Sequence, residues 1–234
     1  MADSVRYWRW GESVAPLREL LARGGMLAIP SESSYGLAAD PRHRDGVAAV
    51  YEAKGRVPRK PLPVVAAELG QLIALGVPRS LPQLEVGMSL WPAPLSVLLP
   101  IAAPLPASAG ESTLAARIPA HRRLRELLVQ LGFAVTATSA NRSGESPVVD
   151  PAALGPILAG REAIAIDDGV LPGGAPSTLV EWRDGQLRVL RHGAFPVAGL
   201  PREIPGLSSR VRSHNSSGAY ERTGRGGSES EIDR

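Results

Sequence analysis

Short apolar segments alternate with amphipathic helical segments, and this alternation constrains the fold more than any other feature of the sequence. Met26–Ile29, Leu95–Leu99 and Ala163–Ile166 are almost entirely apolar, which is typical of buried strands. His121–Leu131 has leucines on one helical face and arginines on the other, which predicts an amphipathic helix. Strands that alternate with helices indicate crossover connections, so we expect an α/β protein.

A hairpin near the end of the folded region makes the predicted sheet a mixed one. Thr178–Trp182 and Leu187–Arg191 flank Arg183-Asp-Gly-Gln186, and Asp-Gly between two strand-like runs is a strong hairpin signal. Ser13 and Asp45 are candidate N-caps for two further helices. Pro63 limits the strand candidate Leu62–Val65 to an edge or a strand start. Other helices are expected over 67–75, 80–90 and 152–159, and other strands over 113–118 and 133–138.

The chain has 234 residues, enough for one good hydrophobic core. We expect one catalytic or binding domain over residues 10–200. The region 206–234 is rich in Ser, Gly, Arg and Glu and poor in apolar residues, which is typical of a disordered polar tail.

Composition excludes several classes of protein. There are no cysteines, so disulfides, zinc–thiolate sites and cysteine nucleophiles are excluded. The N-terminus has no apolar signal core, and no apolar run approaches the length of a membrane span. The formal net charge of +3 is compatible with a polyanionic substrate or RNA. A cytoplasmic enzyme or binding protein fits these totals best.

The distribution of lysine marks one stretch as unusual. Of the 26 lysine and arginine side chains, only Lys54 and Lys60 are lysines, and both lie beside Arg56 and Arg59. Lysine is a compact, strongly hydrated point charge suited to phosphate, so this stretch is a candidate anion site. The alternative is a solvated basic loop, with Lys54 complementing the dipole at the end of a helix.

Small polar residues gather in loops that follow the predicted strands. The loops 31–36, 54–60, 139–144 and 173–178 offer hydroxyl, amide and cationic groups. Such groups orient a polar ligand, although for each one alone a turn or a helix cap is the commoner explanation. They form no nucleophilic triad, and no general phosphate-loop or dinucleotide motif is present. The hydroxyl and amide side chains concerned are Ser31, Ser33, Ser34, Ser139, Asn141, Ser177 and Thr178.

Arg117 is a lone charge in an otherwise apolar strand candidate. Either it ends the strand and points to solvent, or it forms a bidentate pair with a carboxylate or a phosphate. Asp167 and Asp168 could bind Mg²⁺, but an Asp-Asp-Gly turn is the commoner explanation. The histidines show no metal-ligand spacing, and no metal site is predicted. They are His43, His121, His192 and His214.

Several segments together resemble the YrdC-like threonylcarbamoyl-AMP synthases. Ile29–Asp40 is similar to the family's P-T-E-T-x-Y-G-L-x-x-[DN], and Leu90–Ser96 to its W-P-G-P-[LF]-T. Residues 51–62 resemble its K-x-R followed by N-P-L. Arg117–Pro119, Thr138–Gly144, Pro176–Val180 and Leu190–Gly193 match in order and spacing. The resemblance covers about residues 12–195. Each segment alone is a weak match, but the occurrence of all of them in the same order is specific to the family.

The resemblance implies a twisted, open, mixed sheet with helices around a basic cavity. It implies the reaction of L-threonine, bicarbonate and ATP, with Mg²⁺, to give threonylcarbamoyl-AMP and pyrophosphate. A threonylcarbamoyl transferase complex would then modify tRNA to threonylcarbamoyladenosine. By position, the catalytic set would be Lys54, Arg56, Ser139 and Asn141. Further ATP contacts would come from Lys60, Thr113 and Arg191, and threonine would be held by Ser33, Arg117 and Ser177, with Arg117 on its carboxylate.

The chain departs from the family pattern at several positions. Val65 stands where many members have His, and Lys60 where they have Asn. The threonines of the first loop are Ser31 and Ser33, and Ala93 replaces a glycine. These departures bear on amino-acid specificity more than on the nucleotide site.

Two other readings stay open at this point. The first is a non-catalytic protein of the same fold that binds double-stranded RNA or tRNA. It is weakened by an intact Lys-Arg-Ser-Asn set and by an aromatic content of only 4%, which is low for base-stacking modules. The second is a related carbamoyl-adenylate enzyme with another acceptor.

Overall fold

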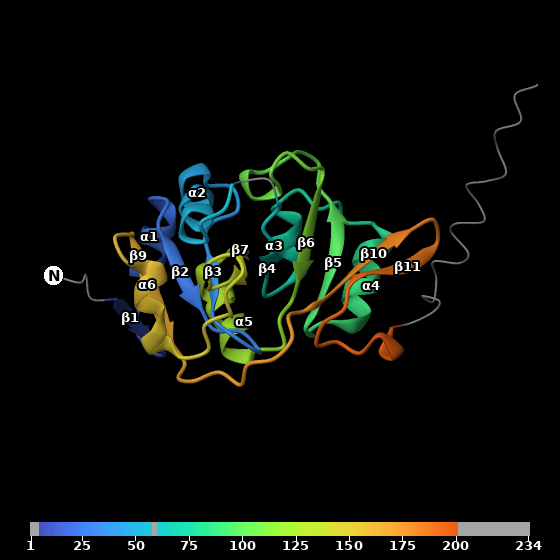
Figure 1. Cartoon of the computed structure of the whole chain (residues 1–234). Helices are drawn as coiled ribbons and strands as arrows, with labels where there is room; N and C mark the ends of the chain where they lie inside the picture. The colour runs from blue at the N-terminus through green and yellow to red at the C-terminus, as the bar shows by residue number, and fades with distance from the viewer. Residues whose placement is uncertain (1–4, 58–59, 201–234) are drawn as a thin grey trace, which may run out of the picture.

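The computed structural model describes residues 5–57 and 60–200 and contains two mixed sheets flanked by helices (Figure 1). The α/β class predicted from the sequence is confirmed, but the strands divide between two sheets. The expected tail at 206–234 and Arg59 lie outside the described residues. Within the described residues, no helix is both long and apolar enough to cross a membrane.

The first sheet has the strand order β1-β9-β2-β3-β8. Its strands are β1 (Arg6–Arg9), β9 (Ala163–Asp167), β2 (Met26–Ile29), β3 (Gly36–Ala38) and β8 (Thr138–Ser139). β9 is parallel to both β1 and β2, whereas β3 is antiparallel to β2 and β8. β1 was not predicted, because its sequence Arg-Tyr-Trp-Arg buries only Trp8 and has no apolar run.

The second sheet has the strand order β11-β10-β5-β6-β4-β7. Its strands are β11 (Gln186–Arg191), β10 (Thr178–Arg183), β5 (Leu95–Pro100), β6 (Thr113–Arg117), β4 (Val64–Val65) and β7 (Val135–Thr136). The predicted hairpin is confirmed as β10 and β11, and Asp184 and Gly185 both have positive φ, as the turn requires. β4 lies inside the sheet with Pro63 just before it, so the proline marks a strand start.

Within the described residues, six α-helices cover the two sheets (Figure 1). They are α1 (Ala15–Ala22), α2 (Arg44–Ala53), α3 (Leu69–Ile73), α4 (Pro82–Leu90), α5 (Arg122–Leu131) and α6 (Gly155–Leu158). Short 3-10 turns occupy Pro106–Ser108, Pro151–Leu154 and Val197–Gly199.

The helix caps differ from those predicted. His43, and not Asp45, caps α2, because its Nδ1 accepts a hydrogen bond from the Gly46 amide. Asp45 lies in the first turn, where its negative charge complements the helix dipole. α1 begins at Ala15 after Val14, but the Ser13 Oγ still accepts a hydrogen bond from the Ala15 amide at 3.3 Å. His121 caps α5 by accepting from the Leu124 amide.

The segment 133–138, predicted as one strand, serves both sheets. Val135–Thr136 pairs with β4 in the second sheet, and Thr138–Ser139 pairs with β3 in the first. Ala137 lies between the two short strands and donates its amide to Pro63. This segment therefore joins the sheets and delivers Ser139 to their junction.

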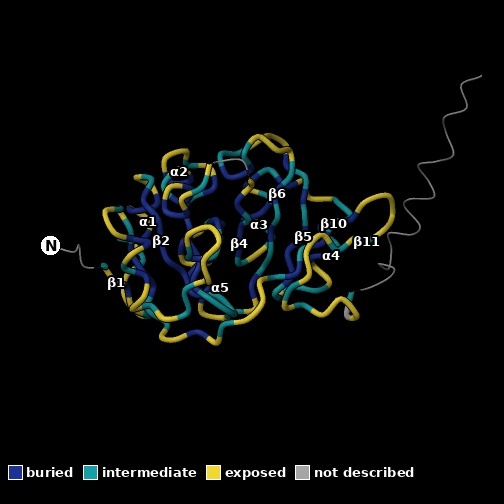
Figure 2. Tube along the Cα trace, in the orientation of Figure 1, coloured by how far each residue is buried: buried dark blue, intermediate teal, exposed yellow. Residues whose placement is uncertain are grey.

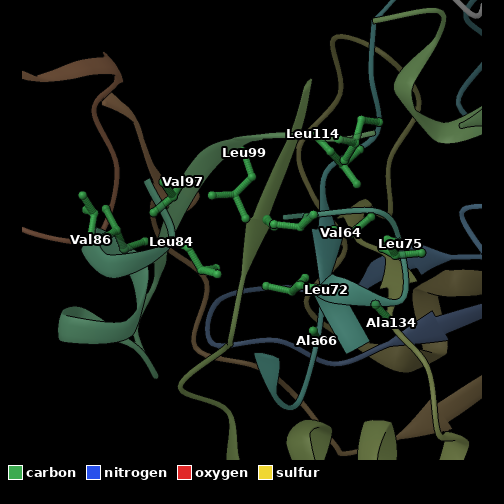
Figure 3. Close-up of a cluster of buried hydrophobic side chains, with 14 of the residues drawn as sticks. Val64, Ala66, Leu72, Leu75, Leu84, Val86, Val97, Leu99, Leu114 and Ala134 are labelled. Carbon is green, nitrogen blue, oxygen red and sulfur yellow. The ribbon is translucent and has the colours of Figure 1, made fainter. Parts of the chain in front are cut away.

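Buried positions run through both sheets (Figure 2), and the buried apolar side chains of the described residues form three clusters. One cluster packs α3 and α4 against the second sheet, including Leu72, Leu84 and Leu99 (Figure 3). A second packs α2 and α6 against the first sheet. The third holds the leucines of α1 and α5 together with Ile29 of the first sheet and Val65 of the second. Burying this apolar surface across the junction makes the two sheets one rigid scaffold.

Candidate active site

A cavity of about 390 Å³ lies where loops from both sheets meet. All four polar loops singled out in the sequence contribute to its lining. The segment after β9 crosses to β10 in the other sheet (Figure 1) and brings Pro176 and Ser177 to the cavity. The structure therefore assembles one site from loops that are far apart in the sequence.

The lining of this cavity is strongly cationic. Arg56, Lys60, Arg117 and Arg191 all line it, and the lining within the described residues includes no aspartate or glutamate. Burial, reinforced by the nearby Arg117, lowers the pKa of Arg191 below its usual value. Cations gathered with little compensating charge create a positive potential suited to a polyanion.

Lys54 does not line the cavity and instead clamps the loop that follows β8. It is the C-cap of α2 and only 4% exposed. Its Nζ donates to the carbonyl oxygens of Ser139 at 2.6 Å and Asn141 at 3.1 Å, and to the Asn141 Oδ1 at 3.1 Å. Burial, with a smaller contribution from Arg56, lowers the pKa of Lys54 to about 8. Lys54 therefore acts on this loop and is not a free solvated cation.

Asn141 belongs to the same clamp, whereas Ser139 faces the cavity. The Asn141 Oδ1 accepts from the Ser139 Oγ at 2.5 Å, and its Nδ2 donates to the carbonyls of Arg142 and Glu145. Among the predicted Lys-Arg-Ser-Asn set, Arg56 and Ser139 line the cavity and Lys54 and Asn141 support the loop from behind. The structure thus brings the four residues together, but two of them line the cavity and the other two hold the loop that carries Ser139.

Tyr51 contacts both Arg56 and Lys60. The Arg56 guanidinium lies 5.4 Å from the ring centroid, a cation–π distance. The Tyr51 hydroxyl donates to the Lys60 carbonyl at 2.7 Å. The buried Arg56 Nε has no hydrogen-bond partner among the described residues, so the protein leaves this donor unpaired.

Arg117 forms an ion pair inside the protein and does not point to solvent. Its Nη1 donates to both carboxylate oxygens of Glu32, at 2.6 and 2.7 Å. The Ala120 amide donates to the same carboxylate. Burial alone would raise the pKa of Glu32, but the charge and hydrogen bonds of Arg117, with the Ala120 amide, bring it below its usual value. Within the described residues, the Arg117 Nη2 and Nε carry no hydrogen bond and stay available to an anion.

Ser177 and Arg191 are joined by hydrogen bonds. The Arg191 Nη2 donates to the Ser177 carbonyl at 2.8 Å and to its Oγ at 3.1 Å. Ser33 also lines the cavity, and its carbonyl accepts from the Gly173 amide. Val65 lines the cavity as well and is buried, so an apolar group stands where the resemblance places a histidine.

Thr113 is the one predicted site residue that lies away from the rest. It begins β6, whereas Arg117 ends the same strand at the cavity. Four residues of strand separate the two by about 13 Å. Thr178 is likewise unavailable as a ligand group, because it is fully buried and its hydroxyl donates to the Phe195 carbonyl.

Asp167 and Asp168 are used structurally. The Asp167 carboxylate accepts from the Gly169 amide, as in the predicted turn. Asp168 bonds to Trp10, His121 and Arg123 and so ties the N-terminal strand to α5. Among residues 5–57 and 60–200, no three His, Asp or Glu side chains gather in an arrangement that could hold a metal ion.

Ser96 and Tyr35 line the cavity but were not singled out as ligand groups in the sequence. Ser96 is buried in β5, and its Oγ lies 2.9 Å from the Ser177 Oγ. The Tyr35 hydroxyl bonds to the Gly169 carbonyl, and burial raises its pKa to about 12. Both residues lie in segments that resemble the family pattern, and that resemblance was the only feature of the sequence that could have marked them.

Two mixed sheets that enclose a cationic, hydroxyl-lined cavity define an α/β protein with an anion-binding site. The Sua5/YciO/YrdC family model, which carries the description Telomere recombination, matches residues 19–193. The chain belongs to this family, as the sequence resemblance predicted.

Curated relatives and solved structures agree with this assignment. A threonylcarbamoyl-AMP synthase of Xanthomonas campestris pv. campestris is 37% identical over 180 residues, covering 71% of this chain and 91% of that protein. One of Halorhodospira halophila is 39% identical over 145 residues, covering 61% of this chain and 74% of that protein. The structure of P. abyssi Sua5 complexed with L-threonine matches with a TM-score of 0.72 at 26% identity. It covers 86% of this chain, which spans 63% of the length of that Sua5 chain.

Proposed function

We propose that this protein is an L-threonylcarbamoyladenylate synthase. It makes threonylcarbamoyl-AMP and pyrophosphate from L-threonine, bicarbonate and ATP. The observation that carries this proposal is a cavity lined by arginines, a lysine and serines, in a chain 37% identical to a threonylcarbamoyl-AMP synthase over most of that protein's length. A related Sua5 structure holds L-threonine.

The chemistry suits a site without a protein nucleophile. The amine of threonine attacks the carbon of bicarbonate, and loss of water gives a carbamate. A carbamate oxygen then attacks the α-phosphorus of ATP, a new P–O bond forms, and pyrophosphate leaves with the electrons of the broken bond. Negative charge grows on phosphate oxygens, so fixed cationic donors supply the stabilisation. Holding three small reactants together removes much of the remaining entropic barrier.

The described geometry suggests a role for each side chain. Arg56, Lys60 and Arg191 are the cavity cations for the triphosphate, and Ser139 adds a hydroxyl beside them. The open edge of Arg117 receives the threonine carboxylate, with Ser33 and Ser177 as neighbouring hydroxyls. Lys54 and Asn141 act by holding the Ser139 loop. A contact of Thr113 with ATP requires the nucleotide to extend along β6.

Mg²⁺ belongs to the proposal as an ion that arrives with ATP. The lining offers hydroxyls but no carboxylate among the described residues. Such a donor set fits an ion held mainly through phosphate oxygens and water, as Mg²⁺ commonly is. The ion would screen charge between the phosphates.

The product implies a partner and a place of action. A threonylcarbamoyl transferase complex would consume threonylcarbamoyl-AMP and modify tRNA to threonylcarbamoyladenosine. We place both steps in the cytoplasm, where ATP and tRNA are available. RNA binding without catalysis is the weaker alternative, because the relatives carry the name of a synthase.

Pyrophosphate release from ATP tests the proposal. The assay is run with Mg²⁺ while threonine and bicarbonate are each present or omitted. We expect release only when both are present, and at least ten-fold less from Arg56→Ala, since lost charge stabilisation of this kind typically costs a factor of 100 or more. Arg23→Ala is the control, because Arg23 is exposed and lies outside the cavity lining. Release without threonine would contradict the proposal and point to another acceptor.

A further inference from the structure

Ser96, Ser177 and Arg191 form a chain of hydrogen bonds along one wall of the cavity. All three residues line the cavity. The Arg191 Nη2 donates to the Ser177 Oγ at 3.1 Å, and the Ser177 Oγ lies 2.9 Å from the Ser96 Oγ. Ser96 is only 3% exposed, and among the described residues its hydroxyl bonds only to Ser177.

The pairing of three strands places these side chains together. β5 is parallel to β10, with Leu179 opposite Ser96, and Leu179 is also opposite Arg191 of β11. Ser177 precedes β10, and the adjacent Thr178 amide donates to the Pro94 carbonyl. The arrangement is therefore fixed by the backbone of the second sheet and does not depend on a flexible loop.

Counting donors and acceptors limits what the Ser177 hydroxyl can do. A guanidinium only donates, so the Ser177 Oγ must accept from Arg191. Its own proton then goes either to Ser96 or to the cavity. If Ser96 donates to Ser177, the Ser177 Oγ accepts two hydrogen bonds and its proton is free for a ligand.

An anionic ligand favours the arrangement in which Ser96 donates to Ser177 and Ser177 donates to the ligand. The oxygens of an ionised carboxylate or carbamate accept hydrogen bonds and cannot donate them. The Ser177 proton must therefore point at the anion, and the Ser96 proton must point at Ser177. Two donors onto the Ser177 oxygen also strengthen the hydrogen bond that it donates, because hydrogen bonds in a chain polarise one another.

We propose that Ser96 is a positioning residue that turns the Ser177 hydroxyl into a donor for the anionic end of the amino-acid substrate. This inference rests on the proposed function, in which Ser177 lies at the threonine subsite. Ser96 acts through Ser177, so its effect belongs to the affinity for the amino acid and not to the affinity for ATP.

The test is a double-mutant cycle of Ser96→Ala and Ser177→Ala. Dissociation constants for L-threonine are measured by calorimetry, and sulfate, which carries no proton at neutral pH, serves as a second acceptor-only probe. We expect Ser96→Ala to weaken binding about five-fold, the usual effect of one uncharged hydrogen bond. In the Ser177→Ala background it should change nothing, because a coupled pair is non-additive.

Two further variants separate positioning from folding. Ser96→Thr keeps the hydroxyl and should restore affinity to near the wild-type value. Ser89→Ala is the matched control, since Ser89 bonds to the Val86 carbonyl and lies outside the cavity lining. In the steady-state assay, Ser96→Ala should raise KM for threonine and leave KM for ATP unchanged.

An equal loss in both backgrounds, or no loss in either, would overturn the role of Ser96. If wild-type protein binds sulfate but not threonine, the proposed function fails while the cycle is still read with sulfate. In that case coupling between Ser96 and Ser177 supports the hydrogen-bond chain, and additive effects overturn it.

Discussion

At the scale of single residues, the ion pair between Arg117 and Glu32 links the loop between β2 and β3 to the end of β6. The side chains are 12% and 21% exposed, so the pair is largely removed from water. Glu32 bonds to one edge of the guanidinium only. It therefore fixes the orientation of Arg117 while the other edge stays open to the cavity.

This pair predicts an acid-dependent loss of stability. The folded pKa of Glu32 is below its ordinary value of about 4.5, so the stabilisation is fully present above that value. It is lost as the pH falls through the folded pKa. We expect Glu32→Gln to lower the free energy of unfolding by about 2 kcal/mol at neutral pH, and the difference from wild type to shrink below about pH 4. Urea unfolding at several pH values measures it.

Glu19→Gln is the control for this substitution, because Glu19 is exposed on α1 and an exposed carboxylate contributes little to stability. A difference between Glu32→Gln and wild type that stays constant from neutral to acid pH would contradict the role assigned to the carboxylate charge.

Lys54 predicts a different kind of change, because it supports a loop. In Lys54→Met the carbonyls of Ser139 and Asn141 lose their donor. We expect a destabilisation of about 2 kcal/mol and a fall in synthase activity of more than ten-fold, measured by thermal unfolding and pyrophosphate release. Arg23→Met, at an exposed cation, should change neither. Full activity of Lys54→Met would rule out the clamp.

The ionisation of Lys54 adds a pH dependence with two opposite signs. Its folded pKa of about 8 lies below the ordinary 10.5. Between these values the unfolded chain holds a proton that the folded chain has released, so this group raises stability as the pH increases. Activity should fall over the same window as the clamp loses its charge. A pH–activity profile of wild type that stays flat from pH 7 to about pH 10 would contradict this assignment.

At the scale of elements, Gly193 sets the position of the segment that carries Ser177. A Cβ atom at Gly193 would lie 2.2 Å from the Pro176 carbonyl oxygen and 2.5 Å from the Ser177 carbonyl carbon. These are backbone atoms, so Gly193→Ala must displace the segment and with it the chain from Ser96 to Arg191.

We expect Gly193→Ala to raise KM for threonine at least ten-fold, since a displacement of about 1 Å at a positioned group can cost a factor of 100. Gly155→Ala is the matched control, because a Cβ there meets nothing within 4 Å and the glycine has a helical φ. Steady-state kinetics gives KM for threonine in both variants. Wild-type KM in Gly193→Ala would show that the segment tolerates the shift.

Elements with a strong local pattern were predictable from the sequence, and those decided by long-range pairing were not. The leucines of α5 and the Asp-Gly turn of β10 and β11 carry their own signals. The division of 133–138 between two sheets depends on partners at Pro63 and Gly36 that no local pattern reveals. Likewise Arg117 could be predicted as a functional charge, but not its pairing with Glu32 across 85 residues. The resemblance identified the loops, and only the structure separates Lys54 and Asn141 from the cavity lining.

At the scale of the whole molecule, the site exists because two sheets are joined at their loop ends. The apolar cluster that includes Leu124, Ile29 and Val65 holds the sheets together. Each sheet then contributes part of the lining, with Ser33 and Ser139 from the first and Ser96, Arg117 and Arg191 from the second. A rigid junction of this kind keeps cations close together without a ligand present, which is the preorganisation that phosphate chemistry requires.

The most direct test of this account follows the carbon of bicarbonate. The protein is incubated with ATP, Mg²⁺, L-threonine and ¹³C-bicarbonate, and the nucleotide products are separated and analysed by mass spectrometry. We predict a threonylcarbamoyl-AMP that carries the label, and its absence when threonine is omitted. AMP formation without labelled product, or no nucleotide product from folded protein, would contradict the assignment of this cavity as a synthase site.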